Sequence, residues 1–290
     1  MNRQFTLSDI EFSLEIFPPR TEAGVDHLMQ TVDAYTSLNP SMITVTFGAG
    51  HSSGVVFDAR QTVKWVAGRT HLPVAAHMTF ASRSREEVDA IIDSFWADGV
   101  RCIVALRGDI LPDGTPNAVR SDSYVYTYDF IAAIKKHYPA MRVLVAGYPE
   151  KHPESPTEEF DLDHLKRKID AGADGVLTQF FFDPEVFLRW QDKVTARGVS
   201  VPLIPGLMPI LNFHRTAELA KRCNAVIPGF LHAMFDGIQA DSIDHKLLAM
   251  NVLSHQITRL IENGVKRFHF YTLNDTLLTR HLCVWLRAGF

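Results

Sequence analysis

Short apolar runs alternate with amphipathic segments along most of the chain. Each apolar run is typical of a buried strand, which predicts strands over 12–17, 42–47, 74–79, 103–106, 142–148, 175–182, 201–207 and 267–271. Between them, apolar residues recur at helical spacing, which predicts helices over 23–35, 59–69, 84–98, 126–137, 162–171, 184–197, 213–222 and 276–287. Further helical pattern covers 227–261 before the last strand.

Eight strands alternating with eight helices favour an α/β fold, a single (β/α)8 TIM barrel over 1–290 with additional helices near the C-terminal part. A chain of 290 residues is long enough to bury most of the surface that its unfolded form exposes, so one large domain is possible. An open doubly wound sheet is the alternative, and its usual sign is G-x-G-x-x-G after the first strand. Glu15-Ile16-Phe17-Pro18-Pro19 stands there instead, and Gly48-Ala49-Gly50 lacks the third glycine.

Local signals mark several element ends. Ser84, followed by Glu87, is a helix start signal. Gly99, Gly198 and Gly264 each close a predicted helix just before a strand. Glycine supplies the left-handed conformation that ends a helix in this way, so these junctions support the alternation.

Composition narrows the class of protein. Apolar residues make up 46% and charged residues 21%, as in ordinary globular proteins, and the net charge of -4 excludes a broad basic field for nucleic acid. No apolar run has the roughly 18 residues of a membrane span, and residues 1–9 have no apolar secretory core, so we expect a cytoplasmic protein. Cys102, Cys223 and Cys283 are odd in number and widely spaced, so we expect small buried thiols rather than disulfides.

Polar residues gather where the predicted strands end. Catalytic groups of such barrels project from the C-terminal ends of the strands. These ends carry Glu15, Thr46, His77, Arg107 with Asp109, Tyr148, Gln179 and Tyr271. Each alone could be a hydrogen-bonded rim residue, but together they favour a site.

Two of these residues are carboxylates in different surroundings. Glu15 is flanked by apolar residues, so we expect it to be partly desolvated, as a general acid requires. Asp109 lies beside Arg107 and should stay ionised. Such a pair can divide acid and electrostatic roles, although a buried salt bridge from Glu15 to an Arg or Lys is the alternative.

A metal site is not expected. The first strand end has no H-x-H, the chain has no H-E-x-x-H, and His269 has only His281 near it in sequence. No strand end offers a Schiff-base lysine. A demanding reaction without either group indicates an organic cofactor.

Cations and rings suited to a flavin dinucleotide follow the strand ends. Arg107, Arg167 and Lys168 can neutralise phosphates, although the last two could instead form a solvated basic face. Tyr126, Tyr148 and His152 can contact rings and hydroxyls.

Six segments carry a more specific signal: Leu14-Glu15-Ile16-Phe17-Pro18-Pro19-Arg20, Val45-Thr46-Phe47-Gly48-Ala49, Leu106-Arg107-Gly108-Asp109, Tyr148-Pro149-Glu150-Lys151-His152-Pro153, Thr178-Gln179-Phe180-Phe181-Phe182-Asp183 and Phe268-His269-Phe270-Tyr271-Thr272-Leu273-Asn274. In order and spacing they resemble those of the bacterial methylenetetrahydrofolate reductases, over nearly the whole chain. The resemblance implies a flavin barrel that reduces 5,10-methylenetetrahydrofolate to 5-methyltetrahydrofolate. Hydride would pass through FAD from NADH or NADPH.

The resemblance also implies residue roles. Glu15 matches the general acid that protonates folate N10, and Asp109 the carboxylate that stabilises the resulting 5-iminium cation near flavin and pterin. Gln179 matches the residue that contacts the pterin edge, with Tyr271 nearby as a further substrate contact. The matched FAD contacts are Thr46, His77, Arg107, Gly108, Asp109, Tyr126, Thr127, Tyr148, His152, Asp161, His164, Arg167 and Lys168.

The chain departs from the family at several positions. The loop before Tyr126 is longer than usual, and His164 replaces an asparagine. Asp275 stands in place of an arginine that holds the folate tail, while Arg215 replaces a neutral glutamine. We hypothesise that Arg215 supplies the missing cation. Leu219 replaces a phenylalanine, which affects the nicotinamide contact.

Two other functions stay open at this point. A pterin-binding methyltransferase barrel would bind folate without FAD, and a flavin- or folate-binding module would show no turnover. For the assembly we expect a homo-oligomer, with 227–261 as a candidate contact face.

Overall fold

The computed structural model describes residues 10–19, 21–46, 59–108 and 119–288. Its strands are β1 (Glu11–Ile16), β2 (Met42–Val45), β3 (Val74–Thr79), β4 (Cys102–Leu106), β5 (Arg142–Gly147), β6 (Gly175–Thr178), β7 (Leu203–Ile204), β8 (Gly206–Leu207) and β9 (Arg267–Tyr271). Its helices are α1 (Glu22–Ser37), α2 (Ala59–Arg69), α3 (Arg85–Ala97), α4 (Thr127–His137), α5 (Glu158–Asp170), α6 (Pro184–Ala196), α7 (Phe213–Cys223), α8 (Gly229–Phe235), α9 (Ile243–Glu262) and α10 (Thr276–Ala288).

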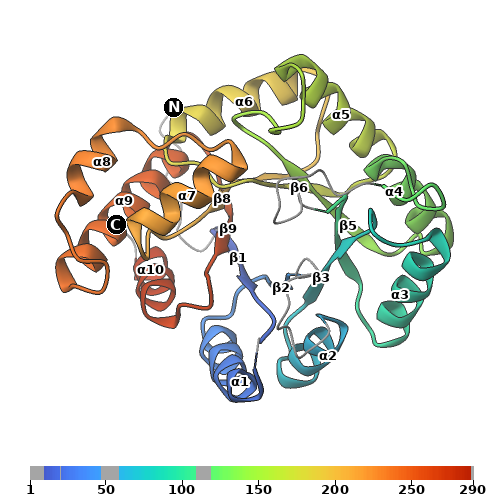
Figure 1. The fold of residues 1–290 in the computed structure, drawn as a ribbon, viewed down its shortest axis with the longest axis horizontal. Helices are drawn as coiled ribbons and strands as arrows, with labels where there is room; N and C mark the ends of the chain where they lie inside the picture. Colours follow the sequence, from blue (N-terminus) through green and yellow to red (C-terminus); the bar gives the residue numbers. More distant parts are fainter. Residues whose placement is uncertain (1–9, 20, 47–58, 109–118, 289–290) are drawn as a thin grey trace.

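The strands form one parallel sheet that nearly closes into a barrel. Its order is β7-β6-β5-β4-β3-β2-β1-β9-β8. The two edge strands, β7 and β8, follow each other in the chain and are separated only by Pro205. Figure 1 shows the strands in a ring with helices outside it. The predicted TIM barrel is confirmed, and the open-sheet alternative is wrong.

We call the place where the edge strands β7 and β8 meet the seam of the barrel. Its structure differs from the sequence prediction. The strand predicted over 201–207 is interrupted at Pro205, because proline has no N–H for a sheet hydrogen bond. Before this residue, Leu203 pairs with Val176 of β6, and after it Gly206 pairs with His269 of β9. One broken segment thus joins both sides of the seam.

Two other element bounds differ from the prediction by more than two residues. The strand predicted over 175–182 ends at Thr178, because the phenylalanines that follow pack instead into hydrophobic clusters with the helices. Helix α5 begins at Glu158 rather than 162. The Thr157 side chain accepts a hydrogen bond from the Phe160 N–H at 3.1 Å and caps this earlier start.

Most local signals are confirmed. Ser84 and Glu87 form the reciprocal capping pair at the start of α3, and the helical pattern over 227–261 contains α8 and α9. Gly99, Gly198 and Gly264 have φ of 86°, 78° and 86°. These left-handed values explain why glycine ends each of those helices.

The two faces of the barrel strands differ in chemistry. Outward side chains such as Leu14, Ile16 and Val45 join the helices in one large hydrophobic cluster. The inward face holds a smaller apolar cluster built from β2 to β7, formed by Met42, Ala75, Cys102, Val104, Leu144, Leu177 and Ile204. The buried polar residues on the strands are Ser13, Glu15, Thr44, His77, Thr178 and His269. The barrel interior is therefore most polar between β9, β1, β2 and β3.

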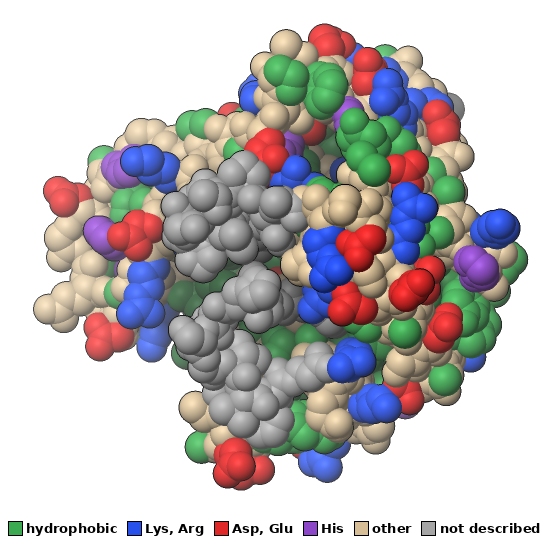
Figure 2. Space-filling view, turned by 45° about the vertical axis from the view of Figure 1, so that its right-hand side comes forward, with side chains coloured by type: hydrophobic (Ala, Val, Ile, Leu, Met, Phe, Trp, Pro, Cys, Tyr) green, Lys and Arg blue, Asp and Glu red, His purple; other side chains and the backbone are tan. Residues whose placement is uncertain are grey.

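The surface over the helices carries both signs of charge. Figure 2 shows Lys and Arg side by side with Asp and Glu on one face. Lys193 of α6, for example, lies 2.7 Å from Glu158 of α5. Across the described ranges, none of the helices is long and apolar enough to cross a membrane.

Candidate active site

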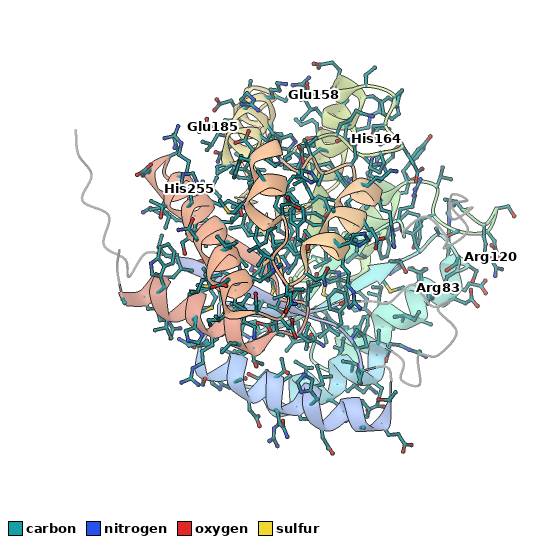
Figure 3. All side chains as sticks on the ribbon, turned by 60° about the vertical axis from the view of Figure 1, so that its left-hand side comes forward. Arg83, Arg120, Glu158, His164, Glu185 and His255 are labelled. Carbon is teal, nitrogen blue, oxygen red and sulfur yellow. The ribbon has the colours of Figure 1, made fainter. Side chains whose placement is uncertain are left out.

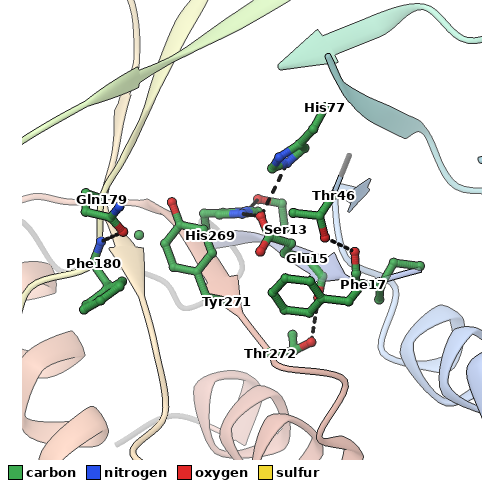
Figure 4. A network of polar contacts seen from close by, with 12 residues as sticks. Ser13, Glu15, Phe17, Thr46, His77, Gln179, Phe180, His269, Tyr271 and Thr272 are labelled. Atoms are coloured by element: carbon green, nitrogen blue, oxygen red, sulfur yellow. Dashed lines mark hydrogen bonds and ion pairs between the residues drawn. The ribbon is translucent and has the colours of Figure 1, made fainter. Parts of the chain in front are cut away.

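Glu15 lies at the carboxyl end of β1 and is buried, with 3% of its surface exposed. Its Oε2 is 3.4 Å from Nε2 of His77 on β3 and 3.8 Å from Nε2 of His269 on β9 (Figure 4). Within the described residues these two imidazoles are the basic side chains within 4.0 Å of the Glu15 carboxylate, and the alternative of an Arg or Lys partner is not found there. We call Ser13, Glu15, His77 and His269 the acid pocket.

The acid pocket is electrostatically unusual. Burial lowers the pKa of His77 to about 4, although the neighbouring Glu15 opposes this shift. His77 is therefore neutral at pH 7. The Nε2 atoms of His77 and His269 are buried and, among the described residues, have no hydrogen-bond partner. Buried polar atoms of this kind are rare in proteins and call for an explanation, here a site that also accommodates a ligand.

Ser13 and His269 were missed as site residues. The Ser13 hydroxyl lies 2.8 Å from Nδ1 of His269, and the two residues are register partners, as are Glu15 and Tyr271. Side chains alternate between the two faces of a strand, so residues two positions apart share a face. Ser13 lies two positions before Glu15 and His269 two positions before Tyr271, so this alternation could have revealed both as site residues.

His281, the other histidine considered near His269 in the sequence, is exposed on α10, and its Nδ1 lies 2.7 Å from the Leu277 carbonyl oxygen of the same helix.

Tyr271 braces the seam beside the acid pocket. Its hydroxyl donates to the Thr178 carbonyl at 2.7 Å. A Cβ on Gly206 would lie 2.2 Å from that carbonyl oxygen and 2.5 Å from the Tyr271 ring, so only glycine fits beneath the ring. Burial, followed by the charge of Glu15, raises the pKa of Tyr271 well above its usual value. The phenol thus stays neutral and can donate a hydrogen bond.

Gln179 follows β6 and forms the other side of the site. Its backbone N–H donates to the Gly147 carbonyl at 2.7 Å, and its Oε1 accepts from the Phe180 N–H at 3.0 Å. Figure 4 shows Gln179 across Tyr271 from Glu15. The predicted substrate residues Gln179 and Tyr271 are therefore neighbours at the seam.

A second group of predicted residues follows β4 and β5, and we call Arg107, Tyr148, His152, Asp161 and Lys168 the cofactor rim. Arg107 forms a two-pronged ion pair with Glu154, one contact being 2.8 Å. The rings of Tyr148 and His152 pack edge to face at 4.5 Å. Gly108, next to Arg107, has φ of 119°, which favours glycine.

Helix α5 supplies the rest of the cofactor rim. Asp161 accepts hydrogen bonds from the His152 N–H at 3.2 Å and the Ser155 hydroxyl at 2.9 Å. Lys168 Nζ donates to the Ala146 carbonyl at 3.1 Å. Burial lowers the pKa of Lys168 to about 8, with Asp161 acting in the opposite direction, and burial also lowers the pKa of His152. A nearby anion would favour the charged lysine.

A cluster of rings extends the site along α4 and α5. The Tyr126 ring stacks on the Tyr128 ring with 4.8 Å between ring centres. The centre of the His164 ring lies 5.6 Å from that of Tyr126 and 4.4 Å from that of Phe160. The Arg167 guanidinium is 6.0 Å from the centre of the Tyr128 ring. Tyr126 and Phe160 are each 46% exposed. We call Tyr126, Tyr128, Phe160 and His164 the aromatic cluster; Tyr128 and Phe160 were missed.

The aromatic cluster lies on the predicted cofactor side. Figure 3 shows His164 on α5, and burial together with Arg167 lowers its pKa. Thr127 is the first residue of α4 and follows Tyr126 directly. The predicted cofactor residues of α4 and α5 therefore lie together.

Other predicted residues lie apart or have structural contacts. The Thr46 hydroxyl donates to the Ile16 carbonyl at 2.8 Å. Arg215 is exposed in the first turn of α7, while Asp275 accepts a hydrogen bond from the Leu278 N–H at 2.7 Å and caps α10. An arginine could not accept that bond. Asp109 lies outside the described residues.

Metal ligation has no support in the described ranges, where no group of three or more His, Cys, Asp or Glu side chains could hold a metal ion. What the arrangement offers is a buried carboxyl beside imidazoles, a neutral phenol, and an outer zone of cations and rings. Such a site can move one proton and bind a large anionic cofactor.

Comparisons with known proteins show which family this chain resembles. The family model for methylenetetrahydrofolate reductase matches residues 1–286. The 5,10-methylenetetrahydrofolate reductases of Salmonella typhimurium and Escherichia coli are each 38% identical over 275 residues, 94% of this chain and 90% of the relative. A solved protein from Clostridium thermocellum, described as binding two copies of 5-methyl-5,6,7,8-tetrahydrofolic acid, has a TM-score of 0.64 at 14% identity and covers 97% of this chain and 96% of its own. The last similarity shows the fold alone.

Proposed function

This chain belongs to the methylenetetrahydrofolate reductase family, and we propose that it is an FAD-dependent enzyme in which Glu15 is the general acid. The substrate would be 5,10-methylenetetrahydrofolate and the product 5-methyltetrahydrofolate. NADH or NADPH would supply the electrons. The family supports the reductase reaction, and the acid, the flavin and the donor are our proposals.

The observation that carries the proposal is the buried Glu15 carboxyl beside Nε2 of His77 and His269. A general acid must hold its proton until the substrate binds and then pass it over a short distance. Glu15 would protonate folate N10, which breaks the bond to the bridging carbon and leaves a 5-iminium cation. Neutral His77 adds no positive charge that would oppose that cation.

Further residues would bind and orient the folate. Asp109 would stabilise the cation through its charge, and Gln179 would contact the pterin edge. Tyr271, held by Thr178, would limit the space beside the pterin. Arg215 would neutralise a carboxylate of the folate tail, since Asp275 is used as a helix cap.

The cofactor rim and the aromatic cluster fit FAD. Arg107 and Lys168, with Arg167, can pair with phosphate oxygens, and Gly108, Tyr148, His152 and Asp161 can contact the flavin and ribityl groups. Tyr126 offers an exposed ring for an adenine, with the half-buried His164 ring beside it, and Thr46, His77 and Thr127 complete the proposed contacts. When bound, FAD would supply the hydride carrier that these side chains lack.

Experiment can exclude the two alternative functions. A purified protein with a flavin absorption band and extractable FAD would exclude a pterin-binding methyltransferase barrel. Anaerobic single-turnover reoxidation of the reduced protein by 5,10-methylenetetrahydrofolate, with 5-methyltetrahydrofolate as product, would exclude a binding module. A colourless protein that does not bind added FAD, or a reduced flavin that the folate does not reoxidise, would contradict the proposal. The cytoplasmic location and the homo-oligomer stay predictions.

A further inference from the structure

The backbone that carries Glu15 is held by side chains rather than by a continued sheet. The β1–β9 pairing ends at Glu15 and Tyr271. Beyond that point, the Asn274 amide makes two hydrogen bonds to Phe17. Its Oδ1 accepts from the Phe17 N–H at 2.9 Å, and its Nδ2 donates to the Phe17 carbonyl at 3.1 Å. One side chain thus replaces both hydrogen bonds of a strand partner.

Thr272 holds Glu15 itself. Its hydroxyl donates to the Glu15 carbonyl at 2.5 Å and accepts from the Asn274 N–H at 3.1 Å. Thr272 is fully buried. The threonine and the asparagine therefore form one connected unit, and we call Thr272, Leu273 and Asn274 the β9 clamp.

The β9 clamp has an uncommon backbone conformation. Leu273 and Asn274 have φ of 53° and 58°, both in the left-handed region. A branched apolar residue such as leucine rarely adopts this conformation, and backbone strain of this kind clusters at functional sites. Leu273 packs against the hydrophobic cluster that contains Phe180 and Met208, which holds it in place.

We propose that Asn274, together with Thr272, is a positioning residue for the Glu15 carboxyl. The inference rests on the proposed role of Glu15 as the acid. On the other side, the Ile16 carbonyl is held by the Thr46 N–H at 3.0 Å and hydroxyl at 2.8 Å. Three successive residues, from Glu15 to Phe17, are thus fixed by Thr272 and Asn274, which follow β9, and by Thr46, which follows β2. Figure 4 shows the contacts of Thr272 and Thr46. This restraint keeps the carboxyl 3.4 Å from His77.

The test separates positioning from general stability. Asn274→Ala removes both hydrogen bonds to Phe17, and Asn274→Asp keeps the acceptor but cannot donate when ionised. The matched control is Asn39→Ala, since Asn39 also has a positive φ of 46° but is exposed between α1 and β2, at the opposite end of the barrel. For each variant the melting temperature, FAD affinity and rate constants of both half-reactions are measured.

Asn274→Ala should slow folate-dependent reoxidation about 100-fold, a loss that a misplacement of about 1 Å can cause. Its pH profile should shift, while reduction by the nicotinamide donor and FAD affinity stay unchanged. Asn274→Asp should fall between wild type and Ala and serves as the folded variant if Ala does not fold. Asn39→Ala should alter neither half-reaction.

Equal loss of both half-reactions, in step with the melting temperature, would overturn the positioning role. So would a wild-type folate rate in both Asn274 variants. Failure of the proposed function has a different signature, because the wild-type reduced flavin would then not be reoxidised by 5,10-methylenetetrahydrofolate at all.

Discussion

The acid pocket and the cofactor rim differ in where they lie in the fold and in how deeply their side chains are buried. The acid pocket lies on strands, and Glu15, His77 and His269 are almost completely buried. The cofactor rim lies on loops and α5, and the side chains of its Arg107–Glu154 ion pair are 30% and 28% exposed. Burial strengthens each electrostatic interaction, whereas partly exposed charges are screened. Changes in the pocket should therefore be large and selective, and changes in the rim smaller.

The largest effect should come from Glu15→Gln. The amide has nearly the same shape but cannot give a proton, so folate reduction should fall about 10²- to 10⁴-fold while FAD stays bound. Steady-state turnover and the flavin spectrum measure the two effects. Glu11→Gln is the control, because Glu11 lies on the same strand but is exposed and paired with Arg267. Near wild-type folate turnover in Glu15→Gln would show that this carboxyl is not the acid.

His77 should make stability depend on pH. Its pKa is about 4 in the folded protein, whereas the ordinary value for histidine is 6.5. Between these values the unfolded chain binds a proton that the folded chain does not, so stability is complete above pH 6.5 and falls as the pH is lowered towards 4. The loss is about 1 kcal/mol per pH unit.

His77→Gln should remove this part of the acid sensitivity. Urea unfolding midpoints of wild type and variant are measured between pH 6.5 and pH 4, and the two midpoints should converge as the pH is lowered. Parallel curves would show that burial does not keep His77 neutral.

Lys168→Met tests the cofactor rim. The change removes the Nζ that we place near a phosphate, so the affinity for FAD should fall about tenfold, as for one lost charged hydrogen bond. Titration of the FAD-free protein measures this, and Lys166→Met on the same helix is the control, since Lys166 pairs with Asp170. Equal losses in both variants would indicate an effect on α5 rather than on the cofactor.

The smallest effect is expected at Arg215. An exposed ion pair contributes up to about 1 kcal/mol, so Arg215→Ala should weaken folate binding about threefold without changing FAD affinity. Lys221→Ala, in the last turn of α7, is the control. Unchanged folate affinity in Arg215→Ala would refute the hypothesis that this cation replaces the one missing at Asp275.

Much of the fold follows from local patterns, because helix signals such as Ser84 and the closing glycines act within a few residues. The seam could not be predicted in this way, because the break that Pro205 makes depends on β6 and β9, which lie beside it in space but far from it in the sequence. Glu15, His77, Tyr148 and Tyr271 could be chosen as candidate site residues because they lie at or just after the ends of strands. The Asn274 contacts to Phe17 join residues far apart in the chain, so only the folded structure reveals them.

The aromatic cluster shows the same limit. Tyr126 and His164 could be named from the resemblance, but the sequence pattern places Phe160 in a loop, because the start of α5 depends on the cap at Thr157. Ser13 and His269 form the opposite case, since strand period alone could have revealed them.

The acid pocket and the cofactor rim would serve separate steps of the reaction, and stopped-flow kinetics of Glu15→Gln and Lys168→Met can resolve those steps. In Glu15→Gln, FAD affinity and flavin reduction by the nicotinamide donor should match wild type, while reoxidation by 5,10-methylenetetrahydrofolate is lost. In Lys168→Met, FAD affinity should fall, while the FAD-saturated protein reoxidises at the wild-type rate. If both variants lost FAD affinity and folate reoxidation together, the separation of acid pocket and cofactor rim would be wrong.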